Sequence, residues 1–310
     1  MTRDGGKPAL LTEIEGMRAL AVACVLLYHA GFGFHGGYVG VDVFFVVSGF
    51  LITNLLQREY EATGRISLSG FYARRARRLL PAATLVLVAT VILAREMLNP
   101  VRAHQTAVDA MWAGGFVANI HFAEVGADYL QSTLPPSVLQ HWWSLAVEEQ
   151  FYVVWPGLLA ATWAITRRVR VGGLALCLLL AGASFAIGWQ LTRDNPSWGY
   201  FAGWARAWEL ALGGLCAFVW AQRHRVPWRA AGGWGGLAMI GYSAWWFGAD
   251  TAFPGTAALV PVVGTMLVIM SIGAANSPGL VLSLAPLQWI GGRSYGIYLW
   301  HWPLLMILAE

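Results

Sequence analysis

Charged residues are scarce in this sequence. Only 12% of its 310 residues are Asp, Glu, Lys or Arg, and 57% are hydrophobic, whereas soluble domains carry about 25% charged residues. This composition excludes an ordinary soluble globular domain. The formal net charge of +4 does not indicate nucleic-acid binding, because the basic residues gather in short clusters between apolar segments, as they do in membrane proteins.

Cysteine is also rare, and several familiar signals are missing. The three cysteines, Cys24, Cys177 and Cys216, lie in apolar segments, and their spacing predicts neither a disulfide nor a metal site. The sequence lacks the alternating ten-residue segments of a β-barrel. The first apolar run has no small-residue cleavage site and contains Arg18 and His29, so we expect it to be retained as a membrane span rather than removed as a signal peptide.

Apolar runs of about 20 residues recur along the chain instead. Because backbone polar groups inside lipid must be satisfied within the segment, these runs are expected to be helices. The prediction is an all-α, polytopic transmembrane helix bundle with about nine to ten membrane segments. The candidate segments are 17–35, 41–57, 79–95, 106–122, 149–166, 172–190, 204–221, 232–247, 257–273 and 294–309.

The basic residues predict the topology. If all ten segments cross and the N-terminus is cytoplasmic, the 20 Lys and Arg residues divide 11 inside to 9 outside. If 106–122 is instead re-entrant or lies along the outer surface, 16 fall inside, and only Arg95, Arg102, Arg193 and Arg206 remain outside. The positive-inside rule favours the second arrangement. We therefore expect a multi-pass protein of the inner or plasma membrane with a cytoplasmic N-terminus.

Two polar residues share the first apolar run, "EGMRALAVACVLLYHAGFG". Arg18 and His29 are eleven residues apart, which places them on one helix face, about 16 Å from each other. Polar residues inside a membrane usually face the bundle interior and serve a function. Alternatively, Arg18 reaches the cytoplasmic interface with its long side chain and His29 is a satisfied buried imidazole.

Two further motifs follow along the chain. In "GVDVFFVVSGFLIT", Ser48 and Gly49 provide either close helix packing or room for the tail of a ligand. In "FYARRARRLLP", Arg75 and Arg78 converge on one face and suit bidentate phosphate recognition. The commoner use of such an arginine cluster is as a topology signal that also contacts anionic lipid.

A fourth motif, "QHWWSLAVEEQFYVVWP", enters a span from the outer side. His141, Ser144 and Glu148 share one helix face. The paired tryptophans are typical of an interfacial anchor, and the carboxylates are typical of an exposed surface. Neither explains why His141, Ser144 and Glu148 form a polar stripe along the helix. The sequence lacks a nucleophile elbow, so we do not expect a serine-hydrolase triad.

Two weaker features complete the set. Arg206 and Glu209 in "RAWELALGG" are spaced for an i, i+3 ion pair with a structural role. His301 in "SYGIYLWHWPLL" lies within the last span. The pattern is equally compatible with a structural imidazole packed in an aromatic cluster and with a functional residue.

Five of these motifs, all except "RAWELALGG", resemble in their order those of the membrane acyltransferase 3 family, and the resemblance covers residues 1–310 as one transmembrane domain. Members are integral-membrane O-acyltransferases, including a group that acetylates peptidoglycan or lipopolysaccharide. Relatives continue with another span, and many add an extracytoplasmic SGNH-type domain. The resemblance therefore implies a C-terminally truncated domain, with the SGNH-type partner absent from these residues.

The resemblance also implies residue roles. The donor would be cytoplasmic acyl-CoA, most simply acetyl-CoA, with no permanently bound cofactor and no metal. Residues matching the family's donor motifs are Arg18, Arg75, Arg78, Ser48 and Gly49; those matching its catalytic motifs are His29, His141 and Glu148. His29 would act as general base or as transient acyl carrier, and His141 and Glu148 would shape the acceptor side or polarise His29.

The acceptor implied by the family is a hydroxyl group of an extracytoplasmic surface glycan or glycolipid, with membrane lipid as the surrounding partner. Two other classes fit intramembrane His and Arg residues. A transporter of an acylated or anionic solute would move its substrate without consuming acyl-CoA. A membrane scaffold would do neither.

Overall fold

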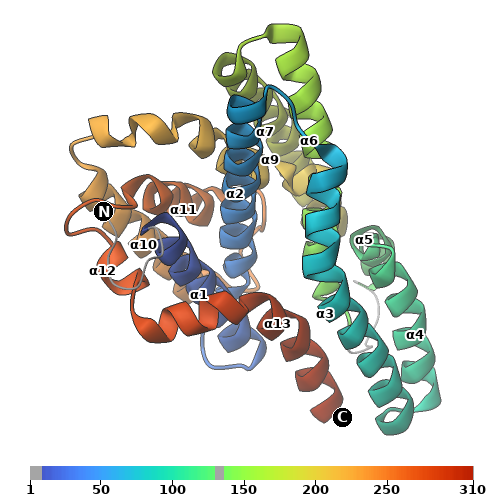
Figure 1. Cartoon of the computed structure of the whole chain (residues 1–310). Helices are drawn as coiled ribbons and strands as arrows, with labels where there is room; N and C mark the ends of the chain where they lie inside the picture. The colour runs from blue at the N-terminus through green and yellow to red at the C-terminus, as the bar shows by residue number, and fades with distance from the viewer. Residues whose placement is uncertain (1–8, 130–135, 310) are drawn as a thin grey trace.

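The computed structural model describes residues 9–129 and 136–309, and every regular element within them is a helix (Figure 1). The longer helices are α1 (Ala9–His29), α2 (Gly40–Thr63), α3 (Leu68–Met97), α4 (Pro100–Gly114), α5 (Ala118–Tyr129), α6 (Trp142–Thr166), α7 (Val169–Asp194), α9 (Gly203–Val219), α10 (Arg229–Trp246), α11 (Leu259–Ser271) and α13 (Ala285–Leu308). The short ones are η1 (Gly37–Val39), α8 (Pro196–Phe201), η2 (Trp220–Arg225) and α12 (Gly279–Leu282). The predicted all-α class is confirmed.

Among the described residues, three helical segments are long and apolar enough to cross a membrane by length and composition: Gly37–Thr63, Leu68–Met97 and Val169–Asp194. Each of the ten expected segments overlaps a helix. The number of crossings stays a prediction.

The segment 106–122, predicted to be re-entrant or to lie along the outer surface, is not one continuous helix, because the chain turns inside it. Helix α4 ends at Gly114, and Phe116 has a left-handed φ of 53° before α5 begins at Ala118. At 1.5 Å per residue, α4 is about 22 Å long and α5 about 18 Å, each shorter than the roughly 30 Å hydrocarbon core. Two short helices of this kind suit a segment that turns back within the membrane.

Helix α1 is also displaced from its expected range of 17–35. It starts at Ala9 and stops at His29, and Gly31 and Gly33 follow with φ of +74° and +79°. Glycine adopts positive φ angles at little cost and therefore often ends a helix. Arg18 therefore lies near the middle of the helix, and His29 is its last residue.

Glycines bring the central helices α2 and α9 into direct contact. A Cβ at Gly49 would lie 1.9 Å from the carbonyl oxygen of Leu210, and one at Gly213 would lie 2.0 Å from that of Val46. Small residues allow this close approach between membrane helices. Gly49 is thus accounted for by helix packing.

Beside this contact lies a fully buried ionic cluster. Arg206 donates to Glu209 at 2.6 Å and to Asp42 at 2.9 Å, and all three residues have no exposed surface. The predicted pair between Arg206 and Glu209 is confirmed. Asp42 is buried as the second carboxylate partner of Arg206.

Candidate active site

A cavity of about 650 Å³, here called the histidine cavity, lies where the C-terminal end of α1 and the N-terminal end of α6 meet the second half of α13. Its lining includes His29, His141, Tyr298 and Trp302, together with Gln140. The volume falls within the roughly 300–1,000 Å³ of small-molecule sites. Two of the three predicted catalytic residues, His29 and His141, are thus brought together.

His29 is paired with a second histidine from the last helix. The His29 Nδ1 and His301 Nε2 atoms are 2.9 Å apart, and the two rings are stacked with an angle of 9° between them. On its other ring nitrogen, His301 Nδ1 lies 2.6 Å from the carbonyl oxygen of Tyr298. Because a carbonyl only accepts, His301 Nδ1 carries the hydrogen, and in the neutral ring its Nε2 accepts from His29 Nδ1. This series of hydrogen bonds leaves the Nε2 atom of His29 without a hydrogen, so its lone pair is available.

His141 closes the buried side of the cavity. Its Nε2 donates to the carbonyl oxygen of Leu299 at 3.1 Å, and its ring meets that of His301 edge-on with centroids 5.4 Å apart. The hydroxyl groups of Ser144 and Tyr298 are 2.6 Å apart, and Tyr298 also donates to the His141 carbonyl at 3.2 Å. These bonds tie α6 to α13 at the cavity.

The predicted polar stripe on α6 is present and is longer than expected. His141, Ser144, Glu148 and Tyr152 follow one another at helical spacing on the same face. Glu148, however, does not meet His29 or line the histidine cavity in the described part of the chain. Its carboxylate accepts hydrogen bonds from Ser48 and Tyr152 instead. The reason is distance along the helix, since Glu148 lies about 10 Å beyond His141.

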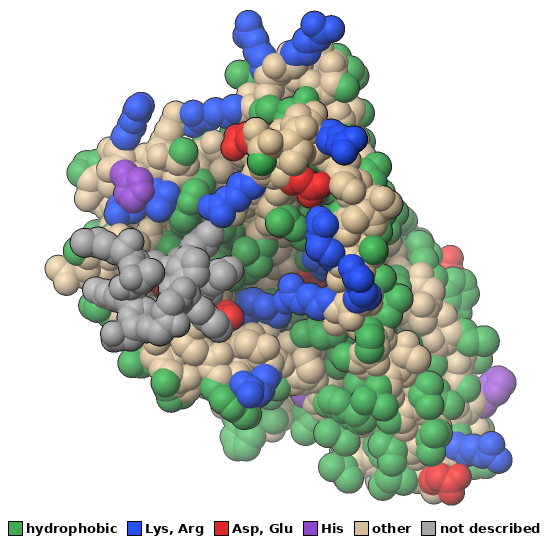
Figure 2. Space-filling view, in the orientation of Figure 1, with side chains coloured by type: hydrophobic (Ala, Val, Ile, Leu, Met, Phe, Trp, Pro, Cys, Tyr) green, Lys and Arg blue, Asp and Glu red, His purple; other side chains and the backbone are tan. Residues whose placement is uncertain are grey.

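The far end of the stripe meets the arginines. Arg75 donates to Glu149 at 3.2 Å, and its guanidinium lies 3.5 Å from the centroid of the Tyr152 ring. Arg18 is close enough to Arg78 and Glu148 to interact electrostatically with both. Arg78 is exposed. Figure 2 shows most of the basic side chains over the upper half of the face in view.

The structure therefore divides the predicted residues between two ends of one stripe. Ser48 and Glu148 lie at the arginine end. Gly49 packs against α9 and lines neither described cavity. In residues 9–129 and 136–309, no cluster of three or more His, Cys, Asp or Glu side chains is arranged to hold a metal ion.

Sequence reasoning gave too little weight to the last helix. His301 and Trp302 complete the surroundings of His29, with the Trp302 ring centroid 4.4 Å from that of His29. Tyr152 was missed entirely as the continuation of the α6 stripe. The available signals were the Trp-His-Trp-Pro block around His301 and the spacing of Tyr152, four residues after Glu148.

The fold and the site define a helical membrane protein with a polar interior that joins an arginine cluster to a histidine-lined cavity. The chain belongs to the acyltransferase 3 family, because the family model described as "Acyltransferase domain" matches residues 11–310. The predicted family is thereby confirmed.

Curated relatives point to the same family. The peptidoglycan O-acetyltransferase OatA of Listeria monocytogenes is 33% identical over 95% of this chain and 49% of its own length. The O-acetyltransferase OatA of Staphylococcus aureus (strain NCTC 8325 / PS 47) is 32% identical over 97% of this chain and 51% of its own length. The chain thus spans about half the length of these relatives. No solved structure matches it.

Proposed function

We propose that this chain transfers an acyl group, most simply acetyl, from cytoplasmic acyl-CoA to a hydroxyl of an extracytoplasmic cell-surface glycan or glycolipid. The observation that carries the proposal is the His29–His301 pair, which presents an imidazole lone pair at a cavity connected by the α6 stripe to Arg75. The names of the relatives, an O-acetyltransferase and a peptidoglycan O-acetyltransferase, support the acetyl group and a cell-wall acceptor.

The membrane arrangement that fits this reaction has nine crossings and the α4–α5 pair as a re-entrant segment. Figure 1 shows the α2–α3 and α6–α7 connections at the top and the α3–α4 connection at the bottom. The basic side chains gathered in the upper half of Figure 2 favour a cytoplasmic top. Two of the expected cytoplasmic charges, Arg3 and Lys7, lie outside the described residues. Part of the connection between α5 and α6, residues 130–135, lies outside them too.

Cysteine labelling tests this topology. A cysteine at Ser137 should react with a membrane-impermeant maleimide added from outside the cell, and one at Gly64 should not. The three native cysteines are buried or half-buried, so the background should be low. Labelling of position 137 only after the cytoplasm is exposed would refute the arrangement.

The donor would bind at the arginine end of the stripe. The phosphates of acyl-CoA are anionic, and Arg18, Arg75 and Arg78 supply guanidinium groups suited to bidentate phosphate contacts. Acyl-CoA is a substrate here and not a resident cofactor. Ser48, Glu148 and Tyr152 lie beside this end, where they would border the path of the pantetheine arm.

At the other end, His29 would act as the general base. Its Nε2 removes the proton from the acceptor hydroxyl while that oxygen attacks the thioester carbonyl. When the tetrahedral intermediate collapses, the carbon–sulfur bond breaks, and the thiolate of CoA takes the proton from His29. The transient imidazolium is favourably placed, because His29 is the last residue of α1, where the helix dipole stabilises positive charge. His141 shapes the acceptor side.

Replacement of His29 by alanine tests the proposal. With labelled acetyl-CoA and membranes containing the chain, His29→Ala should abolish both release of CoA thiol and labelling of the acceptor. The matched control is His35→Ala, an exposed histidine in the connection after α1, which should retain both. A wild-type chain that moves solute without thiol release would support the transporter class and refute the enzyme.

The same assay separates the two roles open to His29. As an acyl carrier, His29 would attack the thioester itself, and one equivalent of thiol would be released before any acceptor is added. As a base, it would release thiol in step with acceptor labelling. We propose the base because His29 lines the cavity that the acceptor must enter.

A further inference from the structure

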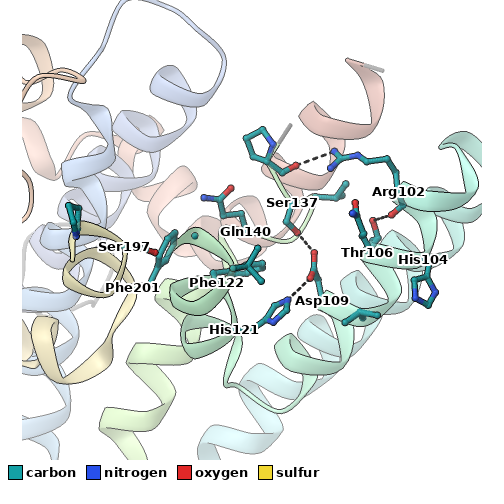
Figure 3. A pocket seen from close by; sticks show the side chains of 17 residues that line it. Arg102, His104, Thr106, Asp109, His121, Phe122, Ser137, Gln140, Ser197 and Phe201 are labelled. Atoms are coloured by element: carbon teal, nitrogen blue, oxygen red, sulfur yellow. Dashed lines mark hydrogen bonds and ion pairs between the residues drawn. The ribbon is translucent and has the colours of Figure 1, made fainter. Parts of the chain in front are cut away.

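A second cavity, here called the Asp109 cavity, lies beside the histidine cavity. It has a volume of about 440 Å³ and is enclosed by α4, α5, α8 and the segment 136–140 (Figure 3). The two cavities share Pro136, Gln140 and Phe201 in their walls. An occupant of one is therefore a direct neighbour of an occupant of the other. His29 and His141 line only the first, so the second is not where the acyl group reacts.

One side of the Asp109 cavity is polar. The Asp109 carboxylate accepts from His121 Nε2 at 2.9 Å through one oxygen and from the Ser137 hydroxyl through the other. The Asp109 and His121 side chains are only 11% and 15% exposed. A carboxylate offers about four lone-pair positions, so two remain for hydroxyl donors of a bound molecule. Placing a carboxylate with unpaired lone pairs against hydrocarbon costs free energy.

Gln140 stands between the two cavities. In the part of the chain that the structure describes, its side chain has no hydrogen bond to protein, although it lines both walls. An amide can donate and accept at once. It also directly precedes His141, so a molecule bound to this amide is held next to the histidines.

The opposite side of the cavity is apolar. Phe122 and Phe201 lie across from Arg102, Thr106 and Asp109 in Figure 3. A sugar ring has this same division, with hydroxyl groups around its edge and C–H groups on its faces. A lipid chain would leave the Asp109 lone pairs unpaired and therefore fits the lining less well.

We propose that the Asp109 cavity binds the sugar unit next to the one that is acylated, as a neutral hexosamine of the acceptor glycan. The inference rests on the proposed function, because the reacting hydroxyl is assigned to His29. It adds that the chain recognises at least two consecutive sugar units: one in each cavity, with Gln140 between them.

The test compares acceptors of different length. The probes are N-acetylglucosamine and its β-1,4-linked tetramer, offered with labelled acetyl-CoA to the full chain in detergent micelles. Val108→Trp fills the cavity from α4, where Val108 lines it. The matched control is Met111→Trp on the same helix, because Met111 is 70% exposed and lies outside the lining. Asp109→Asn is a second variant that keeps the shape and removes the charge.

For the wild type, kcat/KM should be at least about tenfold higher for the tetramer than for the monosaccharide. Val108→Trp should bring this ratio to within about twofold while leaving the monosaccharide rate and acceptor-free thiol release unchanged, and Asp109→Asn should reduce the ratio in part. Met111→Trp should keep it. A wild type without length preference, or a Val108→Trp chain that retains it, as a lipid-filled cavity would predict, overturns the inference.

Failure of the proposed function has a different signature. The wild type would then release no thiol from acetyl-CoA with either acceptor. Calorimetric titration with the tetramer, without acetyl-CoA, still decides the second site. Binding that Val108→Trp weakens about tenfold and Met111→Trp does not supports the site, and absence of binding to the wild type overturns it.

Discussion

Replacement of His301 is the sharpest test of the proposed chemistry. His301 accepts the hydrogen of His29 Nδ1 and is itself fixed by the Tyr298 carbonyl. His301→Leu keeps a similar buried volume but removes the acceptor. His29 would then be free to rotate and to exchange the hydrogen between its two ring nitrogens. Its lone pair would face the cavity for only part of the time.

The size of the effect follows from what is lost. One net hydrogen bond contributes about 0.5–1.5 kcal/mol, and ordering one side chain costs about 0.5–1.5 kcal/mol. Together they amount to about 1–3 kcal/mol, and each 1.36 kcal/mol is tenfold in rate. We therefore expect kcat to fall by about fivefold to 150-fold in His301→Leu. In His301→Gln, the amide oxygen can take the place of Nε2 and should restore kcat to within about tenfold of the wild type.

The assay is steady-state release of CoA thiol, with kcat and KM determined separately. KM for acetyl-CoA should not change, because Arg75 and its partners lie at the other end of the α6 stripe. A purely structural role for His301 would lower the active fraction of Leu and Gln variants alike. The reasoning is refuted if His301→Leu retains the wild-type kcat, or if the Leu and Gln variants lose kcat equally while remaining folded.

Three further predictions concern other parts of the molecule. Arg75→Ala should raise KM for acetyl-CoA about tenfold or more, whereas Arg77→Ala, an exposed arginine bonded to the backbone of its own helix, should not; equal KM values would remove Arg75 from the donor site. Gly49→Ala should destabilise the fold by about 1–3 kcal/mol through overpacking and lower the melting temperature in detergent, whereas Gly157→Ala, where a Cβ has open space, should leave it unchanged. Arg206→Met should cost about 3–5 kcal/mol because two buried carboxylates lose their counter-charge, and an unaltered melting temperature would contradict this role.

Features that depend on one helix could be predicted from the sequence. The stripe of His141, Ser144 and Glu148 follows from the helical period alone, and the ion pair of Arg206 with Glu209 follows from i, i+3 spacing. The boundary of α1 could not be predicted this way. The apolar run continues past His29, and only the positive φ angles at the following glycines end the helix there.

Contacts between different helices could not be predicted from the sequence. His29 and His301 are 272 positions apart, and nothing in either motif indicates that the other faces it. Gly49 has the same residue pattern whether it makes room for a ligand or for a helix, and the contact with Leu210 decides for the helix. Glu148 was assigned to the acceptor side because its motif resembles the family block that enters a span from the outer side, but its height along α6 places it with Ser48.

The two helices that carry the site have matching polar spacing. Arg18 and His29 are eleven residues apart on α1, and His141 and Tyr152 are eleven residues apart on α6. Both separations correspond to about 16 Å, and the helices run in opposite directions, since His141 lies with His29 and Tyr152 with Arg75. The arginine end and the histidine end of the site are therefore held about 16 Å apart, roughly half of the 30 Å hydrocarbon core. In the proposed reaction neither substrate needs to cross the membrane, because the pantetheine arm has only this interval to span.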